Sequence, residues 1–519
     1  MKRNYKPLLS TLMVIPLLFG GCKTSTEQNK LEEKDNPNII VIYMDDLGYG
    51  DVSAYGATEI KTPNIDRLAN GGVMFTRGYA TSATCTPSRY ALLTGTYPWR
   101  NENAKILPGT APLLIDTSQL TLPKLLKDKG YHTGIVGKWH LGLGSGNVNW
   151  NERVAPGPNE VGFDYSYIMA ATQDRVPTVY LENGYVVGLD PEDPIYIDYQ
   201  NNFEGEPTGL ENPELLKMKW HHGHNNSIVN GIPRIGFMKG GKSAHWVDED
   251  MADDFLGKAK EYIVSHKNEA FFLYYALQQP HVPRTPNQRF VGSSGMGPRG
   301  DVIIEADWCV GELMKTLEEE ELLENTFIVF SSDNGPVLND GYYDDAVEKL
   351  GDHNPMGGWR GGKYSLFEAG TRVPFITYWK GKIEPAVSDA MVCHIDLLTS
   401  IAELTGSDRK APDSKDLLET FLGNTEQGRE ELVIEATSRT AFRKESWVLI
   451  PPYDGPSRNT LVNIELGNSD EFQLFNLETD PGQQKNLATE NPEKLQEMIR
   501  EFEAIRGKGY SKTEALELK

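Results

Sequence analysis

The stretch "NIIVIYMDDLGYGD", residues 38–51, decides the fold, because a continuous apolar run ends in two aspartates. A short apolar run rich in β-branched residues is typical of a strand buried on both faces of a sheet. Four further runs of this kind lie at 132–137 "HTGIVG", 270–277 "AFFLYYAL", 326–332 "TFIVFSS" and 373–379 "VPFITYW". Helical patterns separate several of these runs, as in "NIDRLANGG", "TLPKLLKDKG" and "DVIIEADWCVGELMKTLEEEELL". The sequence therefore predicts an α/β fold with a mixed, mostly parallel central sheet flanked by helices.

The predicted large α/β domain covers residues 37–425. Within it, residues 162–248 are rich in turns, aromatics, Asn and Gly, and are too long for a simple connection. We expect them to form a lobe over one edge of the sheet. Residues 426–519 carry short apolar runs and a last helical run, which predict a smaller C-terminal α+β domain with an antiparallel sheet.

The N-terminus has the pattern of a bacterial lipoprotein signal. A basic start, a short apolar run and "LFGGC" ending at Cys22 predict a signal peptide over residues 1–21, because the run is too short to cross a bilayer. Cys22 is the expected lipid-attachment site, although Phe19 stands where that pattern prefers leucine. Residues 22–36 are polar and free of aromatics, as in a flexible tether. We expect an exported protein that is lipid-anchored to the outer membrane; the alternative is a plain signal peptide that is cleaved nearby.

The charge balance bears on possible partners. The chain carries 51 basic and 74 acidic residues, a net charge of −23. Such an excess of negative charge argues against nucleic acid and against nonspecific attraction to an anionic membrane surface.

Two of the remaining cysteines are interpreted as core residues. Cys309 and Cys393 lie in stretches with apolar residues at helical spacing, where a free thiol behaves as a small hydrophobic group. The alternative is a disulfide between them.

Polar side chains follow two of the predicted strands. Asp45 and Asp46 follow the first run, and Asp333 and Asn334 follow "TFIVFSS". Ligands of open α/β sheets collect beyond the carboxyl ends of the strands, so these groups are expected to converge. Three carboxylates and an amide oxygen favour Ca²⁺ or Mg²⁺ over zinc. The alternative is that both motifs are only turn formers.

Cys85, in "TSATCTPSRYALLTG", does not fit such a site as a thiol. A soft thiolate is a poor partner for a hard cation, and no base lies near Cys85 in the sequence. We therefore expect position 85 to act through an oxygen.

The stretch "CTPSRYALLTG" resembles the signature of the type I sulfatases, which are similar in fold to alkaline phosphatase. The resemblance continues in order through "PNIIVIYMDDLGYGD", "TPNIDRLANGGVMFTRGYA", "TGIVGKWHLG", "QQPHVPRTP", "SSDNG", "RGGKYSLFEAGTRVP", "HIDLL" and "LFNLETDPGQQKNLA". It implies that a formylglycine-generating maturation enzyme oxidises Cys85 to formylglycine. Cys85, Pro87 and Arg89 would then be a recognition tag for that enzyme.

The resemblance also implies roles for individual residues. One Ca²⁺ would be bound by formylglycine 85 and by Asp45, Asp46, Asp333 and Asn334. Arg89 and Lys138 would hold formylglycine, and His140 would contact one of its hydroxyls. His281, in protonated form, and Lys363 would bind the sulfate. Many relatives have a second histidine where Gln279 stands, a departure that bears on substrate contacts.

The predicted lobe supplies candidate substrate residues, since aromatic, amide and basic groups suit a sulfated saccharide. They are Gln173, Asp174, Arg175, His221, His222, His224, Arg234 and Lys242, joined by Arg360 near Lys363. "HHGH" could instead bind a transition metal or be simple loop structure.

The expected function is hydrolysis of sulfate monoesters on a sulfated polysaccharide or its oligosaccharides, with O6-sulfated galactose-type sugars favoured. Ulvan, carrageenan, glycosaminoglycans and mucin glycans stay open. Two alternatives are a phosphodiesterase or phosphatase of the same fold and a glycan-binding surface lipoprotein without activity.

Overall fold

The computed structural model describes Met1 and residues 36–510. The predicted signal peptide, Cys22 and the tether up to residue 35 lie outside the described residues. Among the helices that the structure describes, none is both long and apolar enough to cross a membrane.

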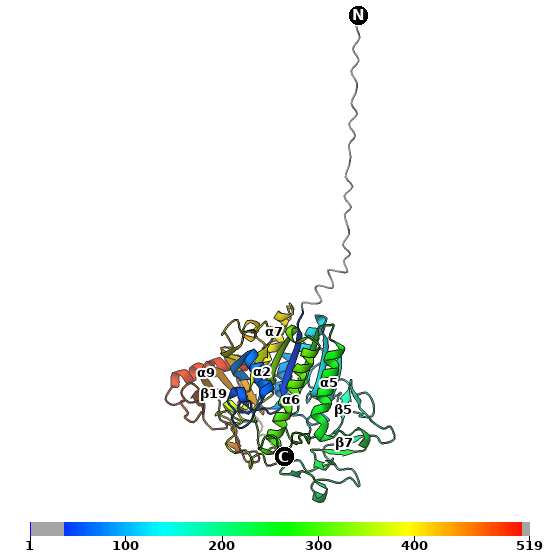
Figure 1. The fold of residues 1–519 in the computed structure, drawn as a ribbon. Helices are drawn as coiled ribbons and strands as arrows, with labels where there is room; N and C mark the ends of the chain where they lie inside the picture. Colours follow the sequence, from blue (N-terminus) through cyan, green and yellow to red (C-terminus); the bar gives the residue numbers. More distant parts are fainter. Residues whose placement is uncertain (2–35, 511–519) are drawn as a thin grey trace.

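A ten-stranded sheet forms the centre of the molecule (Figure 1). Its strands, in spatial order, are β16 (Ala386–Cys393), β2 (Val73–Tyr79), β15 (Phe375–Tyr378), β13 (Thr326–Ser332), β1 (Asn38–Met44), β12 (Phe271–Ala276), β3 (His132–Lys138), β4 (Tyr165–Met169), β5 (Tyr180–Glu182) and β6 (Tyr185–Val186). The run from β13 to β4 is parallel, whereas β15, β5 and β6 pair antiparallel with their neighbours. The predicted mixed, mostly parallel sheet is confirmed.

The strand β1 is buried on both faces, as its apolar run predicts. Val41 lies opposite Tyr274 of β12 and Val329 of β13. Because side chains alternate along a strand, Ile39 and Val41 face one side of the sheet and Ile40 and Ile42 the other. Each side therefore needs its own covering layer.

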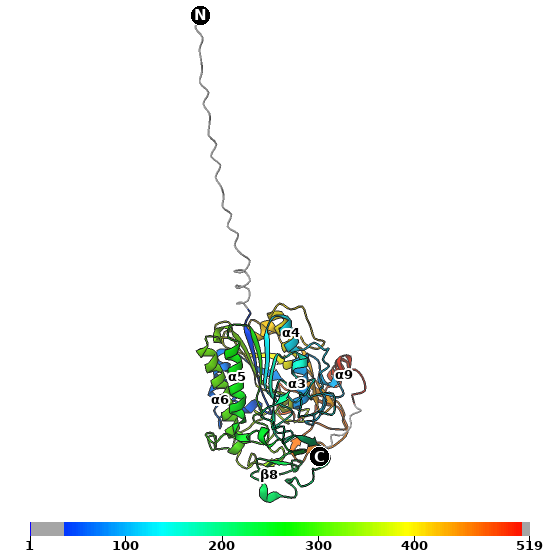
Figure 2. The ribbon, with the colours of Figure 1, turned by 90° about the vertical axis from the view of Figure 1, so that its right-hand side faces the viewer.

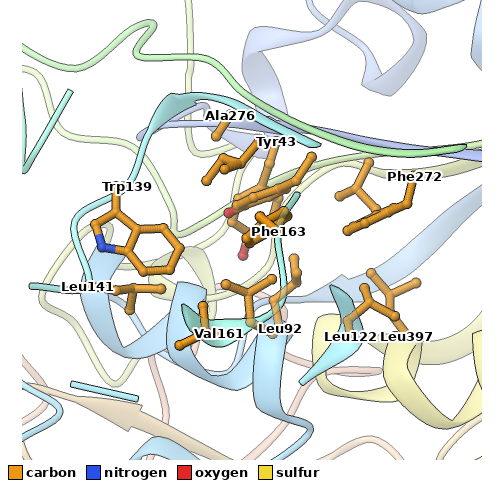
Figure 3. Packing of buried hydrophobic residues seen from close by; sticks show 14 of the residues in the cluster. Tyr43, Leu92, Leu122, Trp139, Leu141, Val161, Phe163, Phe272, Ala276 and Leu397 are labelled. Atoms are coloured by element: carbon orange, nitrogen blue, oxygen red, sulfur yellow. The ribbon is translucent and has the colours of Figure 1, made fainter. Parts of the chain in front are cut away.

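Helices supply those two layers, which Figure 2 shows on opposite sides of the sheet. One layer contains α2 (Pro63–Gly71), α5 (Met251–Ser265) and α6 (Gly297–Glu319). The other contains α3 (Cys85–Thr94), α4 (Leu122–Asp128), α7 (Leu397–Leu404) and α8 (Leu418–Phe421). Figure 3 shows the second layer, where Leu92, Leu122 and Leu397 lie beneath Tyr43 and Phe272.

Residues 162–248 extend one edge of the sheet through β4, β5 and β6 and then form an irregular lobe. Its short strands, with β14 from the loop after β13, pair in two-stranded sheets: β7 (Tyr196–Asp198), β8 (Lys219–Trp220), β9 (Ile228–Val229), β10 (Ile232–Pro233), β11 (Phe237–Lys239) and β14 (Tyr342–Tyr343). In Figure 1 the chain enters β1 at the top, so the carboxyl ends of the parallel strands lie lower, on the side of β7.

A separate antiparallel sheet with a terminal helix forms the C-terminal part, as predicted. The sheet contains β17 (Glu431–Ala436), β18 (Arg439–Lys444), β19 (Trp447–Ile450) and β22 (Gln473–Asn476), and a nearby ribbon pairs β20 (Arg458–Asn459) with β21 (Ile464–Glu465). The helix α9 (Pro492–Arg506) packs on this sheet through Met498 and Phe502.

Cys309 and Cys393 are both buried and free. Cys309 lies in α6, but Cys393 ends the strand β16 and not a helix; α7 begins at Leu397. The two thiols lie in different hydrophobic clusters, so the alternative of a disulfide between them is wrong.

Candidate active site

The carboxyl ends of three parallel strands bring the predicted polar residues together. Asp45 and Asp46 follow β1, Asp333 and Asn334 follow β13, and His281 follows β12. The Asp46 amide donates to an Asp333 carboxylate oxygen over 3.2 Å, which joins the two loops. Asp46 adopts a left-handed backbone conformation with φ of 65°, a conformation that aspartate tolerates better than most residues.

Three buried cations balance three buried carboxylates. Lys138, the last residue of β3, donates to Asp45 Oδ2 over 2.6 Å. Arg89 of α3 donates to Asp333 Oδ2 through Nε at 3.0 Å and Nη2 at 2.7 Å. The third pair joins Lys363 Nζ to Asp46 Oδ2 over 2.8 Å. Since unpaired buried charges are costly, this matching stabilises the buried cluster.

Cys85 lies at the first residue of α3, against a histidine from the end of β3. Its Sγ is 3.3 Å from His140 Nδ1, and His140 Nε2 donates to the Leu107 carbonyl over 2.9 Å. No base lies near Cys85 along the chain, but the fold brings His140 beside it. The expectation that Cys85 lacks a nearby base is therefore wrong. Burial raises the pKa of the Cys85 thiol and lowers that of His140 well below its usual range. Both groups are neutral, so the pair is not an activated thiolate.

Unpartnered oxygens in this cluster fit a hard cation. Asp45 Oδ1 and Asn334 Oδ1 are buried without a hydrogen-bond partner. The Asn334 amide nitrogen donates to Asp46 Oδ1 over 2.7 Å, which turns its own oxygen away from that bond. Burial raises the pKa of Asp45 well above its usual range despite the opposing charge of Lys138. A Ca²⁺ ion prefers oxygen ligands and stabilises the charged form of buried carboxylates. The unpartnered oxygens of Asp45 and Asn334 therefore fit such an ion.

His281 and Lys363 lie on the same side of this cluster. His281 Nδ1 donates to the Val282 carbonyl over 2.7 Å, so Nε2 carries the lone pair, 3.9 Å from Asp46 Oδ2. Burial and the charges of Lys363 and Lys138 lower the pKa of His281 well below its usual range. This shift disfavours the expected protonated form of His281, and an anion bound beside it would raise its pKa.

Asp340, a residue that the sequence analysis missed, shares Lys363. Its Oδ2 accepts from Lys363 Nζ over 2.9 Å, and its Oδ1 accepts from the Tyr364 hydroxyl over 3.1 Å. Burial alone would raise the pKa of Asp340, but Lys363 holds it well below its usual range. The residue stands in "LNDGYY", which looks like a turn, so no sequence pattern signals this contact.

Three of the candidate substrate residues form a buried group beside the site. The Asp174 carboxylate accepts from His224 Nε2 over 2.8 Å and from Arg175 Nη1 over 3.0 Å. His222 and His221 follow at the rim, with their Nδ1 atoms 2.7 Å apart, and the ring of His221 contacts Tyr343.

The other candidates have structural partners. Arg234 is fully buried and donates to Asp248 and to the Gln173 carbonyl. Gln173 donates to Asp248 and Thr285. Arg360 pairs with Glu465 and reaches the Gln483 carbonyl in the C-terminal part. Lys242 is exposed, and its amide donates to Asp193 on the outer part of the lobe. These four residues therefore hold loops in the structure.

The sheet, its two helical layers and the cluster of paired charges at the carboxyl ends of its strands define a hydrolase of the alkaline phosphatase-like superfamily. The sulfatase family model matches residues 37–407. The chain therefore belongs to the sulfatase family and is a sulfuric ester hydrolase.

Comparisons with characterised proteins agree with this assignment. The chain is 50% identical over 509 residues to an N-acetylgalactosamine-6-O-sulfatase of Bacteroides thetaiotaomicron, covering 97% of this chain and 99% of that protein. It is 32% identical over 413 residues to human arylsulfatase A, covering 76% and 70% of the two chains. A solved structure from a study of glycosaminoglycan metabolism by B. thetaiotaomicron superimposes with a TM-score of 0.90 at 51% identity, covering 91% of this chain and all of that one.

Proposed function

We propose that this protein removes the 6-O-sulfate from N-acetylgalactosamine units of glycosaminoglycan-derived oligosaccharides. The observation that carries the proposal is the 50% identity, over nearly the whole chain, to a protein named for that activity. The buried cations around Cys85 support a monoanionic sulfate ester as the bound group. The Asp174, Arg175 and His224 group beside them supplies donors and an acceptor for sugar hydroxyls.

The proposed chemistry needs an oxygen nucleophile at position 85. Oxidation of Cys85 to formylglycine by a maturation enzyme supplies it, because the hydrated aldehyde carries hydroxyl groups that a thiol lacks. Ca²⁺, held by Asp45, Asp46, Asp333 and Asn334, would polarise the sulfate oxygens when bound. His140 Nδ1 lies 3.3 Å from Cys85 Sγ, so it can accept a proton from a hydroxyl group at position 85.

Lys363 and His281 face the other end of the reacting bond in this proposal. Lys363 offsets charge on the sulfate oxygens, and His281 Nε2 carries the free lone pair that can take up a proton once the bound anion raises its pKa. That proton can then pass to the departing sugar oxygen, since an alkoxide is a poor leaving group.

The mass of the peptide from Gly78 to Arg89, from protein isolated from its own cells, tests the modification. An aldehyde or its hydrate at position 85 is the expected result. Cys85→Ala should abolish sulfate release, whereas Cys309→Ala, which alters a buried thiol of the core, should keep the activity of the unchanged protein. A fully unmodified thiol in an active sample would contradict the proposed nucleophile.

Defined substrates test the specificity. We expect release of sulfate from 6-O-sulfated N-acetylgalactosamine oligosaccharides, and little from the 4-O-sulfated isomers or from matching phosphate monoesters. Preference for the phosphate esters would favour the phosphatase alternative. Binding without release, in a sample that carries formylglycine, would favour the glycan-binding alternative.

We further propose that the protein is exported and lipid-anchored through Cys22 to the outer membrane. The support is the basic start followed by a short apolar run and "LFGGC". Cys22→Ser should move the protein from the membrane fraction to the soluble fraction of its own cells. Retention of this variant in the membrane fraction would overturn the anchor.

A further inference from the structure

A second group of possible metal ligands lies at the amino end of β3, whereas the Cys85 cluster lies at the carboxyl ends of the strands. His132 is the first residue of β3, His266 directly follows α5, and Glu269 precedes β12. One ligand atom from each lies within 4.8 Å of those of the other two. His132 Nε2 and Glu269 Oε2 are 3.1 Å apart.

The backbone around this group is held by regular hydrogen bonds. The His132 amide donates to the Ala270 carbonyl over 3.0 Å, and the Glu269 amide donates to the His266 carbonyl over 3.0 Å. Because β3 and β12 are neighbouring parallel strands, the sheet holds His132 beside the residues that lead into β12.

His266 is oriented in the way that metal-binding histidines are. Its Nδ1 donates to the Tyr262 carbonyl over 2.9 Å, which fixes the tautomer and leaves the lone pair on Nε2. The ring packs at a tilt of 36° against Tyr262, with 4.3 Å between the centroids, and its centroid lies 5.0 Å from that of His132. Little side-chain freedom is therefore lost when His266 binds a cation.

We propose that His132, His266 and Glu269 bind a Zn²⁺ ion. Two imidazoles and one carboxylate form a ligand set that zinc uses with a fourth position left to water, and that suits Ca²⁺ poorly. The side chains of His132 and Glu269 are 44% and 54% exposed, so an ion can reach them from solvent.

The bound ion would tie the start of β3 to the connection between α5 and β12. At its other end, far from the ion, β3 carries Lys138, and β12 leads to His281. The site is therefore stabilising and takes no part in the reaction, and its test does not depend on the proposed substrate or nucleophile.

The test is a zinc titration of the full chain. The protein is treated with a chelator, returned to excess Ca²⁺, and titrated with ZnCl₂ against a chromophoric competitor. We expect one Zn²⁺ equivalent that is lost in His132→Ala and in His266→Ala, and whose affinity falls at least about 10-fold in Glu269→Gln. Zn²⁺ should raise the Tm of the unchanged protein, whereas the Tm of His266→Ala should not change when Zn²⁺ is added.

His222→Ala is the matched control, because His221 and His222 form the other close pair of imidazoles among the described residues. This variant should keep the Zn²⁺ equivalent. The proposal is overturned if the His132 and His266 variants bind Zn²⁺ as tightly as the unchanged protein, since the group would then be only an ion pair between His132 and Glu269. It is also overturned if His222→Ala removes the ion. Tm values measured in chelator show whether each variant is folded.

Discussion

At the scale of single residues, the charged groups around Cys85 are held by partners that are distant in sequence. Lys363 lies between Asp46 and Asp340, and the latter carboxylate also accepts from Tyr364. The family motif identifies Lys363, but Asp340 stands in a stretch without any pattern of its own. A motif thus finds the candidate catalytic groups, while the residues that fix their positions emerge only from the folded structure.

The first prediction concerns this positioning role. Asp340→Asn should lower kcat/KM for sulfate ester hydrolysis by about 10- to 100-fold, because a charge-assisted hydrogen bond to Lys363 is replaced by a weaker one. Asp345→Asn, an exposed change in the same loop, should leave kcat/KM in place. Steady-state kinetics on both variants measure the effect. Equal rates for Asp340→Asn and the unchanged protein would show that Lys363 does not need this partner.

The second prediction concerns Asp51, which is buried between Arg299 and His353. Its oxygens lie 2.6 Å and 2.8 Å from the Arg299 nitrogens and 2.8 Å from His353 Nε2. Asp51→Asn should lower the free energy of unfolding at neutral pH by about 3 to 5 kcal/mol, because it leaves Arg299 buried without its countercharge. Urea unfolding measures this loss, and Asp408→Asn, an exposed change, should cost less than about 0.5 kcal/mol.

The stability that Asp51 contributes should depend on pH in a defined direction. Burial would raise the pKa of Asp51, but Arg299 and His353 lower it to about 2, from an ordinary 3.8. A lowered carboxyl pKa gives stability that is present above the unfolded value and lost as the pH falls towards the folded one. The difference between the unchanged protein and Asp51→Asn should therefore shrink by about 2 kcal/mol between pH 5 and pH 2. A difference that stays constant over this range would contradict the assignment.

At the scale of elements, the sequence predicts strands well where burial is two-sided. The structure places β1 and β13 at the predicted residues, since every side chain of both is buried and the run has no polar interruption. The prediction fails for Cys393, which ends β16 with only three residues between it and the start of α7, so that the strand and the helix fall within one sequence pattern. Two-residue strands such as β8 and β9 are too short to carry any periodicity.

The helix α6 contributes a buried carboxyl that titrates near neutrality. Glu305 accepts from Gln279 Nε2 over 3.2 Å and from the Asn287 amide over 2.9 Å. Burial raises its pKa to about 7, from an ordinary 4.5. A raised carboxyl pKa gives stability that is full below the unfolded value and is lost as the pH rises through the folded one.

Glu305→Gln should therefore change the pH dependence of stability. From about pH 4.5 to about pH 8, the free energy of unfolding of the unchanged protein should fall relative to that of the variant by about 3 kcal/mol. Denaturant unfolding at several pH values measures the difference. Glu319→Gln, on the exposed face of the same helix, should run parallel to the unchanged protein. A parallel curve for Glu305→Gln as well would show that the carboxyl titrates near its ordinary pKa.

At the scale of the whole molecule, the two sheets share a hydrophobic cluster. Tyr79 of β2 and Cys393 of β16 belong to the same cluster as Val433 of β17 and Phe442 of β18. The two predicted parts therefore share a common core. Glu465 of the β20–β21 ribbon also pairs with Arg360, close to Lys363 in the chain. We expect the described part of the chain to unfold as one unit.

Glu368 lies at the centre of this junction and gives the last prediction. Its carboxylate accepts from Arg443 of β18, from Arg372 and from the Tyr79 hydroxyl, and all four residues are buried. Glu368→Ala leaves two arginines without a countercharge, so the free energy of unfolding should fall by about 3 to 5 kcal/mol. Glu471→Ala, an exposed change in the C-terminal part, should cost less than about 0.5 kcal/mol. Circular dichroism and tryptophan fluorescence should report one transition at one lowered Tm in Glu368→Ala, because the shared cluster still joins the sheets, whereas two separate transitions would show that the two parts fold independently.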